Sequence, residues 1–164
     1  MMMRIELIVN CIRKTFSISP TETLLSLLRR AGYKGVKQGC GSGDCGACAV
    51  LVDSRAVNAC LTMAAKADGR QVTTIEGLAE INRLHPLQQA FLDEGAVQCG
   101  YCTPGMIIAA AGLLMRNSNP TETEVKEAIA GNLCRCTGYI KPVNAIMRAA
   151  QSLREKEEDE CKNR

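Results

Sequence analysis

Short apolar runs separated by turn residues characterise the first part of the chain and predict β-strands. Residues 4–10 and 15–18 each form such a run, and Asn10-Cys11 lies between them. The pattern predicts two strands joined by a tight turn. Glycine usually follows asparagine in such a turn, so the cysteine at position 11 predicts a longer or strained turn.

The next apolar positions recur with the period of a helix. Ser19-Pro20-Thr21-Glu22 carries a capping box and a proline suited to the first helical turn, and Gly32 marks the end of the helix. The buried stripe is expected at Leu24, Leu25, Leu28 and Ala31. Further strands are expected at residues 47–53, 56–58 and 72–75. This order of elements predicts a small α+β domain over residues 1–78.

The second part of the chain has helical periodicity and predicts four helices within residues 79–155. Their expected first turns contain Pro86, Pro104, Thr121 and Pro142. Four short helices favour a compact bundle. Residues 106–115 are apolar on nearly every side, so we expect this helix at the centre of its domain. The polar residues 156–164 are expected to form a disordered tail.

Charge and hydropathy exclude several functions. The chain has 164 residues and a formal net charge of +3, so it lacks the strong basic excess of a nucleic-acid-binding protein. The apolar run at residues 106–115 is too short to span a bilayer. Residues 1–10 lack the features of an export signal. We therefore expect a cytoplasmic protein without a membrane partner, in which cysteines bind metal rather than form disulfides.

Ten cysteines are the strongest anomaly of the composition, and eight of them form two sets. The first set has the spacing Cys40-x4-Cys45-x2-Cys48, with Cys60 as its fourth member. This is the plant-type spacing of a [2Fe–2S] cluster, which carries a charge of about −2 with four thiolates. Nearby glycines let backbone N–H groups approach the sulfurs: Gly39, Gly41, Gly43 and Gly46. A zinc site is the alternative, but structural zinc sites commonly use paired short knuckles.

The second set consists of Cys99-x2-Cys102 and Cys134-x-Cys136. This spacing alone also fits zinc. Cys102 directly precedes an expected helix start, and the positive end of a helix dipole favours an anionic cluster. The residues therefore indicate a second metal centre and favour iron–sulfur, with zinc as the alternative.

Other reactive side chains have simpler interpretations. His85, the single histidine, directly precedes Pro86 and is expected to cap a helix. Cys11 and Cys161 are expected to be free thiols. No group of residues has the pattern of a catalytic constellation, so no catalytic residue is predicted.

Three segments carry a family resemblance: residues 36–48, 95–105 and 131–139. Together they closely resemble the iron–sulfur subunit of the molybdenum hydroxylases, the xanthine dehydrogenase and aldehyde oxidoreductase superfamily, and the similarity covers about residues 4–153. The resemblance implies a plant-ferredoxin-like β-grasp domain followed by a four-helix bundle, each with one [2Fe–2S] cluster.

The resemblance also implies partners. A large subunit would carry molybdopterin, a medium subunit would carry FAD, and the heterotrimer would form a higher-order oligomer. Electrons would pass from molybdenum to the helical-domain cluster, then to the ferredoxin-like cluster and on to flavin. By this similarity Cys136 lies nearest the pterin and Gln98 hydrogen-bonds it. Xanthine dehydrogenase-like chemistry is the family prior, and this chain does not identify the substrate.

Three positions depart from the commonest family pattern: Gln38, Ala49 and Cys11. None of them removes a predicted metal ligand. Two other functions remain as alternatives, a stand-alone ferredoxin-like electron carrier and a zinc-stabilised interaction module.

Overall fold

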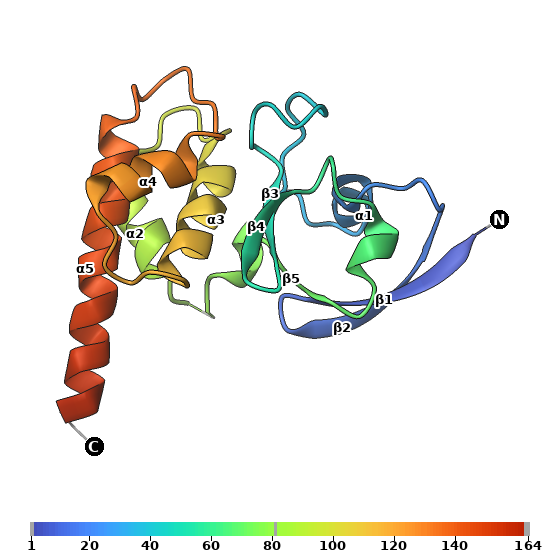
Figure 1. The fold of residues 1–164 in the computed structure, drawn as a ribbon, viewed down its shortest axis with the longest axis horizontal. Helices are drawn as coiled ribbons and strands as arrows, with labels where there is room; N and C mark the ends of the chain where they lie inside the picture. Colours follow the sequence, from blue (N-terminus) through green and yellow to red (C-terminus); the bar gives the residue numbers. More distant parts are fainter. Residues whose placement is uncertain (1, 81, 163–164) are drawn as a thin grey trace.

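A computed structural model describes residues 2–80 and 82–162 of the chain. A sheet with one helix on its outer side occupies one end of the molecule, and four helices occupy the other (Figure 1). The chain begins at the sheet end, and its last helix descends along the opposite side (Figure 1). The structure therefore has the two parts, strand-rich and helical, that the sequence predicts.

Five strands form one mixed sheet in the order β2-β1-β5-β3-β4. Strand β1 pairs antiparallel with β2 and parallel with β5, and β3 pairs antiparallel with both β4 and β5. The strands are β1 (Met3–Val9), β2 (Ile12–Ile18), β3 (Ala49–Val52), β4 (Arg55–Asn58) and β5 (Gln71–Thr73). The sequence predicted each of them, with ends that differ by a few residues.

The hairpin between β1 and β2 has a two-residue turn, because Val9 pairs with Ile12. Asn10 and Cys11 have φ values of 51° and 65°, as a type I′ turn requires. The turn is therefore no longer than the usual one, and Cys11 occupies the left-handed position where glycine is expected. The side chain of Asn10 supports this geometry, since its Oδ1 accepts a hydrogen bond of 2.9 Å from the backbone of Thr74.

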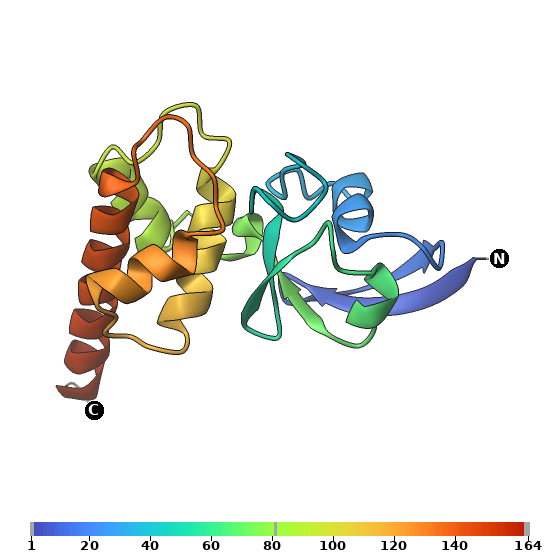
Figure 2. The same ribbon diagram turned by 45° about the horizontal axis from the view of Figure 1, so that its top comes forward.

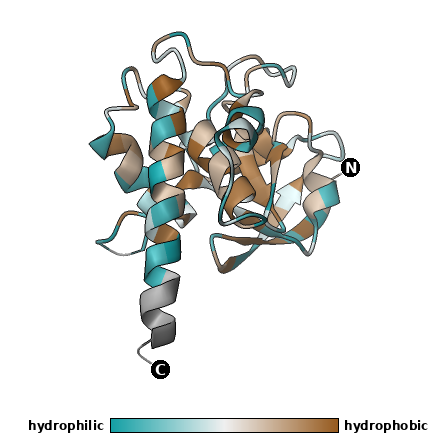
Figure 3. Ribbon diagram, turned by 60° about the vertical axis from the view of Figure 1, so that its left-hand side comes forward, coloured by the Kyte–Doolittle hydropathy of each residue, from teal (hydrophilic) through white to brown (hydrophobic). Residues whose placement is uncertain are grey.

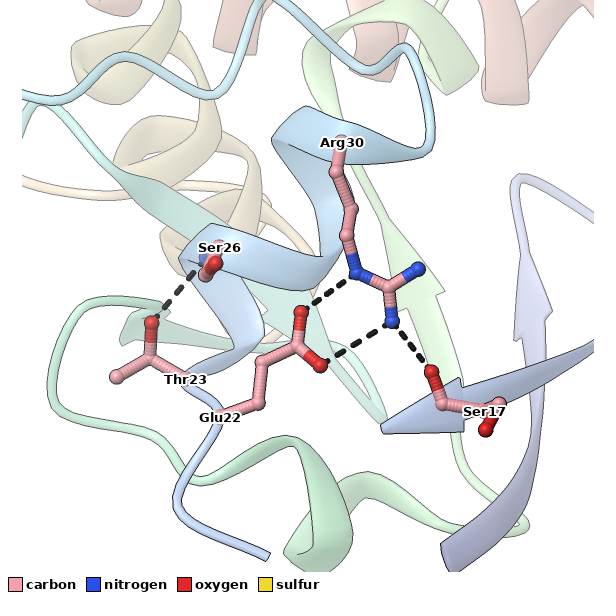
Figure 4. A network of polar contacts seen from close by, with 5 residues as sticks. All are labelled: Ser17, Glu22, Thr23, Ser26 and Arg30. Carbon is pink, nitrogen blue, oxygen red and sulfur yellow. Dashed lines mark hydrogen bonds and ion pairs between the residues drawn. The ribbon is translucent and has the colours of Figure 1, made fainter. Parts of the chain in front are cut away.

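Helix α1 (Leu24–Arg30) begins later than the sequence predicted. Its N-cap is Thr23, which accepts a hydrogen bond from the Ser26 backbone, so the prediction of a cap at Ser19 was wrong (Figure 4). The difference has a tertiary cause, because Thr23 is held in an extended conformation by pairing with Met63. Gly32 follows the helix with a φ of 100°, as predicted for its end.

Glu22, predicted as part of the capping box, instead binds Arg30 at the far end of α1. The guanidinium contacts both carboxylate oxygens, at 2.6 and 3.1 Å, and also donates to the carbonyl of Ser17 at 2.7 Å (Figure 4). Hydrogen bonding and charge from Arg30 lower the pKa of Glu22. This network ties the end of α1 to the end of β2.

Four longer helices make up the second part: α2 (Pro86–Asp93), α3 (Thr103–Leu114), α4 (Glu122–Ile129) and α5 (Ile140–Lys162). Two single turns of 3₁₀ helix, η1 (Ala64–Ala67) and η2 (Ile75–Gly77), flank β5. Thr121 caps α4 through the predicted capping box with Glu124. Among the helices that the described residues form, none combines the length and the apolar character needed to cross a bilayer.

Helix α5 continues to Lys162, past the expected end near residue 155, and the expected disorder of residues 156–164 stays a prediction. No proline or glycine follows Pro142, so nothing in the sequence stops the helix. A side-chain hydrogen bond of 2.8 Å between Gln151 and Glu155 supports the extension. Hydrophilic and hydrophobic segments alternate along α5 in Figure 3, as expected for a helix with one face packed on its neighbours.

Two hydrophobic cores lie on opposite faces of the sheet. The first combines α1 with one face, whereas the second combines the four later helices with Ala49 and Leu51 of β3. Helix α3 is buried along most of its length, as predicted, and lies between the sheet and the remaining helices (Figure 2). The strand-rich and helical parts therefore share a continuous apolar interface.

His85 caps α2 as the sequence predicted. Its Nδ1 accepts a hydrogen bond of 3.2 Å from the backbone of Leu87, and Gln88 completes the capping box. Burial, with the positive charge of Lys156 as a second cause, lowers the pKa of His85. Protonation would remove the acceptor at Nδ1, so the neutral imidazole stabilises the helix start.

The unfolding midpoint should therefore fall as pH drops below about 6.5, the ordinary value of histidine. As the pH falls, His85 of the unfolded chain takes up its proton first. The loss of stability is complete below the depressed pKa of His85 in the folded chain. Thermal unfolding followed by circular dichroism between pH 7.5 and pH 5 measures this. H85N caps without titrating, and it should lose this part of the pH dependence. An identical dependence in H85N and the wild type would contradict the assignment.

Candidate metal centres

The first cysteine set lies on the loop between α1 and β3 and at the end of β4. Gly41, Gly43 and Gly46 have φ values of 75°, 91° and 66°, which let the loop turn back on itself. Gly39 is required for a different reason, since a Cβ there would lie 2.6 Å from the Sγ of Cys45. The loop therefore closes tightly around its sulfurs, as the glycine pattern predicted.

Backbone N–H groups point at the sulfurs of this loop. The N–H of Ser42 donates to Cys40 Sγ and the N–H of Cys40 donates to Cys45 Sγ, both at 3.4 Å. Hydrogen bonds from Ser42 lower the pKa of Cys40 to about 6. The loop is thus arranged to stabilise negative charge on sulfur.

The four sulfurs of the first set fall into two pairs. The thiol of Cys45 acts on the pKa of Cys40, and the thiol of Cys60 acts on the pKa of Cys48, so each thiol lies near its partner. The first pair lies toward the solvent, whereas Cys48 and Cys60 are buried. Burial raises the pKa of Cys48 to about 11 and so disfavours its thiolate, which a bound metal ion would stabilise.

The second cysteine set lies on two loops of the helical part, before α3 and between α4 and α5. The sulfurs of Cys99 and Cys136 are 3.7 Å apart, and both residues are exposed. Cys102 is the N-cap of α3, and the nearby thiol of Cys134 acts on its pKa. Burial raises the pKa of Cys102 to about 12. Burial also acts to raise the pKa of Cys134, but hydrogen bonds from Thr137 outweigh it and lower that pKa to about 7.

The separation of the sulfurs in a pair tests whether one metal ion fits between them. Metal–thiolate bonds of about 2.3 Å in a tetrahedral site place two sulfurs about 3.8 Å apart, close to the Cys99–Cys136 separation. Within the described residues, no three side chains of metal-binding type converge as a mononuclear site would require. Two thiolates for each of two metal ions is the donor set of a [2Fe–2S] cluster. Both cysteine sets fit this group.

The two candidate centres are joined through their loops, which lie along the upper side of the molecule in Figure 1. The N–H of Leu133 donates to the carbonyl of Cys45 at 3.0 Å. The side chain of Asn132, which is buried, donates to the carbonyl of Gly46 at 2.9 Å. Tyr101 donates from its hydroxyl to the carbonyl of Gln38 at 2.6 Å. Each contact therefore joins the loops of the two cysteine sets. All the residues involved are cysteines of a set or lie within two positions of one.

Sequence reasoning missed Asn132, Leu133 and Tyr101 as residues that join the centres. They lie within segments that resemble the family, but nothing in their spacing shows a contact across more than sixty residues. Gln98 was singled out, and its amide donates to the carbonyl of Cys136 at 3.2 Å. Gln98 therefore lies beside the second cysteine set and supports its loop.

Comparisons with known proteins agree with these two centres. Residues 7–79 match the model of a 2Fe-2S iron-sulfur cluster binding domain, and residues 74–158 match that of a [2Fe-2S] binding domain. The chain is 48% identical over 147 residues to the nicotinate dehydrogenase small FeS subunit of Eubacterium barkeri, covering 89% of this chain and 93% of that one. It is 46% identical over 145 residues to the xanthine dehydrogenase iron-sulfur-binding subunit of Escherichia coli O157:H7, covering 87% and 91%.

Solved structures show the same fold. Quinoline 2-oxidoreductase from Pseudomonas putida 86 has a chain that superposes with a TM-score of 0.89 at 39% identity, covering 94% of this chain and 97% of that one. Aldehyde oxidoreductase from Desulfovibrio gigas superposes with a TM-score of 0.91 at 42% identity, covering 94% of this chain. This chain spans only 18% of that longer one. The chain belongs to the family of small iron–sulfur subunits of the molybdenum hydroxylases, which are oxidoreductases.

Proposed function

We propose that this chain binds two [2Fe–2S] clusters and serves as the electron-transfer subunit of a molybdenum hydroxylase. The proposed ligands of the first cluster are Cys40, Cys45, Cys48 and Cys60. Those of the second are Cys99, Cys102, Cys134 and Cys136. The observation that carries the proposal is the gathering of four thiols in each set, with the sulfurs of Cys99 and Cys136 at a separation that suits one shared metal ion.

A bound [2Fe–2S] cluster supplies one-electron redox chemistry. The residues of this chain join the loops of the two proposed centres through direct hydrogen bonds. The hydrogen bond from Leu133 to Cys45 connects the backbone beside Cys134 directly to a ligand of the first set. Helix α3 and strand β3 contribute to one hydrophobic core, which packs the two parts against each other.

Two partner subunits complete the proposed assembly. A large subunit with molybdopterin would meet the second set, where Cys99 and Cys136 are exposed. A medium subunit with FAD would meet the first set, where Cys40 is exposed. Electrons would then flow from molybdopterin to flavin, within a heterotrimer that forms a higher-order oligomer.

Similar relatives are named for different substrates, which bears on specificity. The chain is 48% identical to a subunit named for nicotinate, 51% to one named as a probable xanthine dehydrogenase subunit and 47% to one named for nicotine. We propose xanthine dehydrogenase-like chemistry, with the substrate chosen by the large subunit. This near-equal identity supports a role in which the small subunit transfers electrons and does not bind substrate.

The proposal extends to the fold and the compartment. Residues 1–78 would form a plant-ferredoxin-like β-grasp domain, and residues 79–155 a four-helix bundle that binds the second cluster. None of the nine cysteines within the described residues forms a disulfide, which suits a reducing cytoplasm, and Cys11 is the one among them that lies outside both sets. The side chain of Cys161 lies outside the described part of the chain.

Iron and sulfide analysis of the anaerobically purified complex tests this function. The proposal predicts two irons and two sulfides for each set of four cysteines, and co-purification with two larger subunits. A colourless zinc-loaded protein would support the interaction module instead. A brown protein that purifies without larger subunits would support a stand-alone carrier.

Gln98 is proposed to contact the pterin of the large subunit as well as supporting the Cys136 loop. Q98A should slow reduction of the clusters by substrate, measured by stopped-flow absorbance of the assembled complex. Its iron content should stay unchanged, because Gln98 contributes only one exposed hydrogen bond to the loop. The matched control is Q89A on α2, where Gln89 is exposed and pairs with Asp93. Equal rates in Q98A and Q89A would refute the contact.

A further inference from the structure

A closed ring of hydrogen bonds surrounds Cys134 in the loop between α4 and α5. The hydroxyl of Thr137 contacts Cys134 Sγ at 3.2 Å, and the N–H of Tyr139 donates to the Thr137 hydroxyl at 3.3 Å. The N–H of Cys134 in turn donates to the hydroxyl oxygen of Tyr139 at 2.9 Å. Three residues within a six-residue segment therefore fix one another around a single sulfur.

The ring determines the direction of the Thr137 hydroxyl. Because the N–H of Tyr139 points at the oxygen of Thr137, that oxygen acts as an acceptor there, and its own proton is directed to Cys134 Sγ. The backbone N–H groups of Cys136 and Thr137 also donate to this sulfur, both at 3.4 Å. Cys134 Sγ is therefore surrounded by donors.

Backbone strain accompanies this arrangement. Tyr139 has a φ of 68°, in the left-handed region that a bulky residue rarely adopts. This conformation turns its N–H toward Thr137 while its ring reaches back over the loop to the N–H of Cys134. Strain of this kind persists where the surrounding contacts enforce it, and it commonly marks a functional site.

The sulfur pairs give the two metal positions of the second set different surroundings. Cys99 and Cys136 are exposed, whereas Cys102 and Cys134 are partly buried. Cys134 also follows Leu133, whose N–H bonds to Cys45 of the first set. A metal ion held by Cys102 and Cys134 would thus lie on the less exposed side of the second set. This side is next to the hydrogen bond that joins Leu133 to the first set.

We propose that the Thr137 hydroxyl raises the reduction potential of the second cluster and places the added electron on the iron held by Cys102 and Cys134. This inference rests on the proposed role of Cys134 as a ligand. Reduction adds one electron from the reductant, forms and breaks no covalent bond, and leaves the proton on Thr137. The added negative charge resides partly on sulfur, and hydrogen bonds to the sulfur stabilise it. Thr137 is in this sense a positioning residue that acts through Cys134.

The test compares T137V, which keeps the shape of the side chain without the hydroxyl, with T137S, which keeps the hydroxyl. The potentials of both clusters are measured in the assembled protein by EPR-monitored redox titration. T137V should lower the equilibrium constant for reduction of the second cluster about tenfold, which is about 59 mV for one electron. T137S should stay close to the wild type, and the first cluster should keep its potential in both variants. An unchanged potential in T137V, or equal shifts in T137V and T137S, would overturn the inference.

A second readout reports the proton itself. In D₂O, the backbone N–H groups of Cys136 and Thr137 should give deuteron signals in pulsed EPR of the reduced second cluster in all three proteins. The wild type and T137S should show one further deuteron, that of the hydroxyl, which is absent from T137V. If T137V fails to load the second cluster, Y139F takes its place. It removes the acceptor of the Cys134 N–H and breaks the ring, so a smaller shift in the same direction is expected, and no shift would overturn the inference. A wild-type protein without a second cluster would instead contradict the proposed ligands.

Discussion

Replacing Gly105 by alanine should lower the free energy of unfolding by about 1–3 kcal/mol, as overpacking of a filled interface does. Gly105 lies in the first turn of α3, where a Cβ would be 2.4 Å from the carbonyl oxygen of Gly46 and 3.0 Å from Nδ2 of Asn132. The carbonyl belongs to the backbone of the first cysteine loop and cannot move without displacing that loop. Alanine is otherwise favoured over glycine in a helix, so intrinsic propensity acts in the opposite direction.

Gly131 provides the matched control for Gly105. It lies on the other loop that meets Gly46, but a Cβ there has no neighbour within 4 Å, and its φ is not positive. G131A should therefore unfold at nearly the wild-type urea concentration, whereas G105A should unfold earlier. Urea unfolding of the metal-loaded protein, followed by circular dichroism, makes the comparison. Equal midpoints for the two variants would contradict the close contact between the first turn of α3 and the carbonyl of Gly46.

Replacing Gly39 by alanine should remove the first cluster and leave the second. A Cβ at position 39 would lie 2.6 Å from the Sγ of Cys45, so that sulfur would be displaced from its place beside Cys40. The second set has no contact with this position among the hydrogen bonds of the described residues. G39A should therefore retain about half of the wild-type iron, with the EPR signal of the second cluster unchanged.

The control for G39A is G41A, in the same loop. Gly41 has a φ of 75° but open space around its Cβ position. G41A therefore introduces backbone strain of about 1–2 kcal/mol without blocking a sulfur. It should keep both clusters at reduced stability. Full iron content in G39A, or equal iron loss in both variants, would contradict the steric explanation.

Locally determined features of the fold could be predicted from the sequence. The capping box of Thr121, the cap at His85 and the apolar helix α3 depend on residues close in sequence, and the structure confirms them. The start of α1 was wrong because a tertiary contact, the pairing of Thr23 with Met63, overrides a good local signal at Ser19. Predictions from local patterns fail where a distant strand or loop sets the backbone conformation.

Cysteine spacing indicated two metal centres but not their internal arrangement. The pairing of Cys99 with Cys136, and of Cys102 with Cys134, depends on how two loops meet in the folded chain. The contact of Asn132 with Gly46 spans 86 positions, and no pattern within either segment reveals it. The connection between the centres therefore emerges only from the packing of α3 against the sheet.

The most direct test of the account is EPR of the dithionite-reduced protein carrying one cysteine replacement in each proposed set. The wild type should give two distinct signals of reduced [2Fe–2S] clusters. C45S should lose one and keep the other, C136S should show the converse, and C11S should keep both, because Cys11 lies in the β1–β2 hairpin outside both sets. Loss of the same signal in C45S and C136S, or a single signal in the wild type, would contradict the claim that this chain holds two separate clusters.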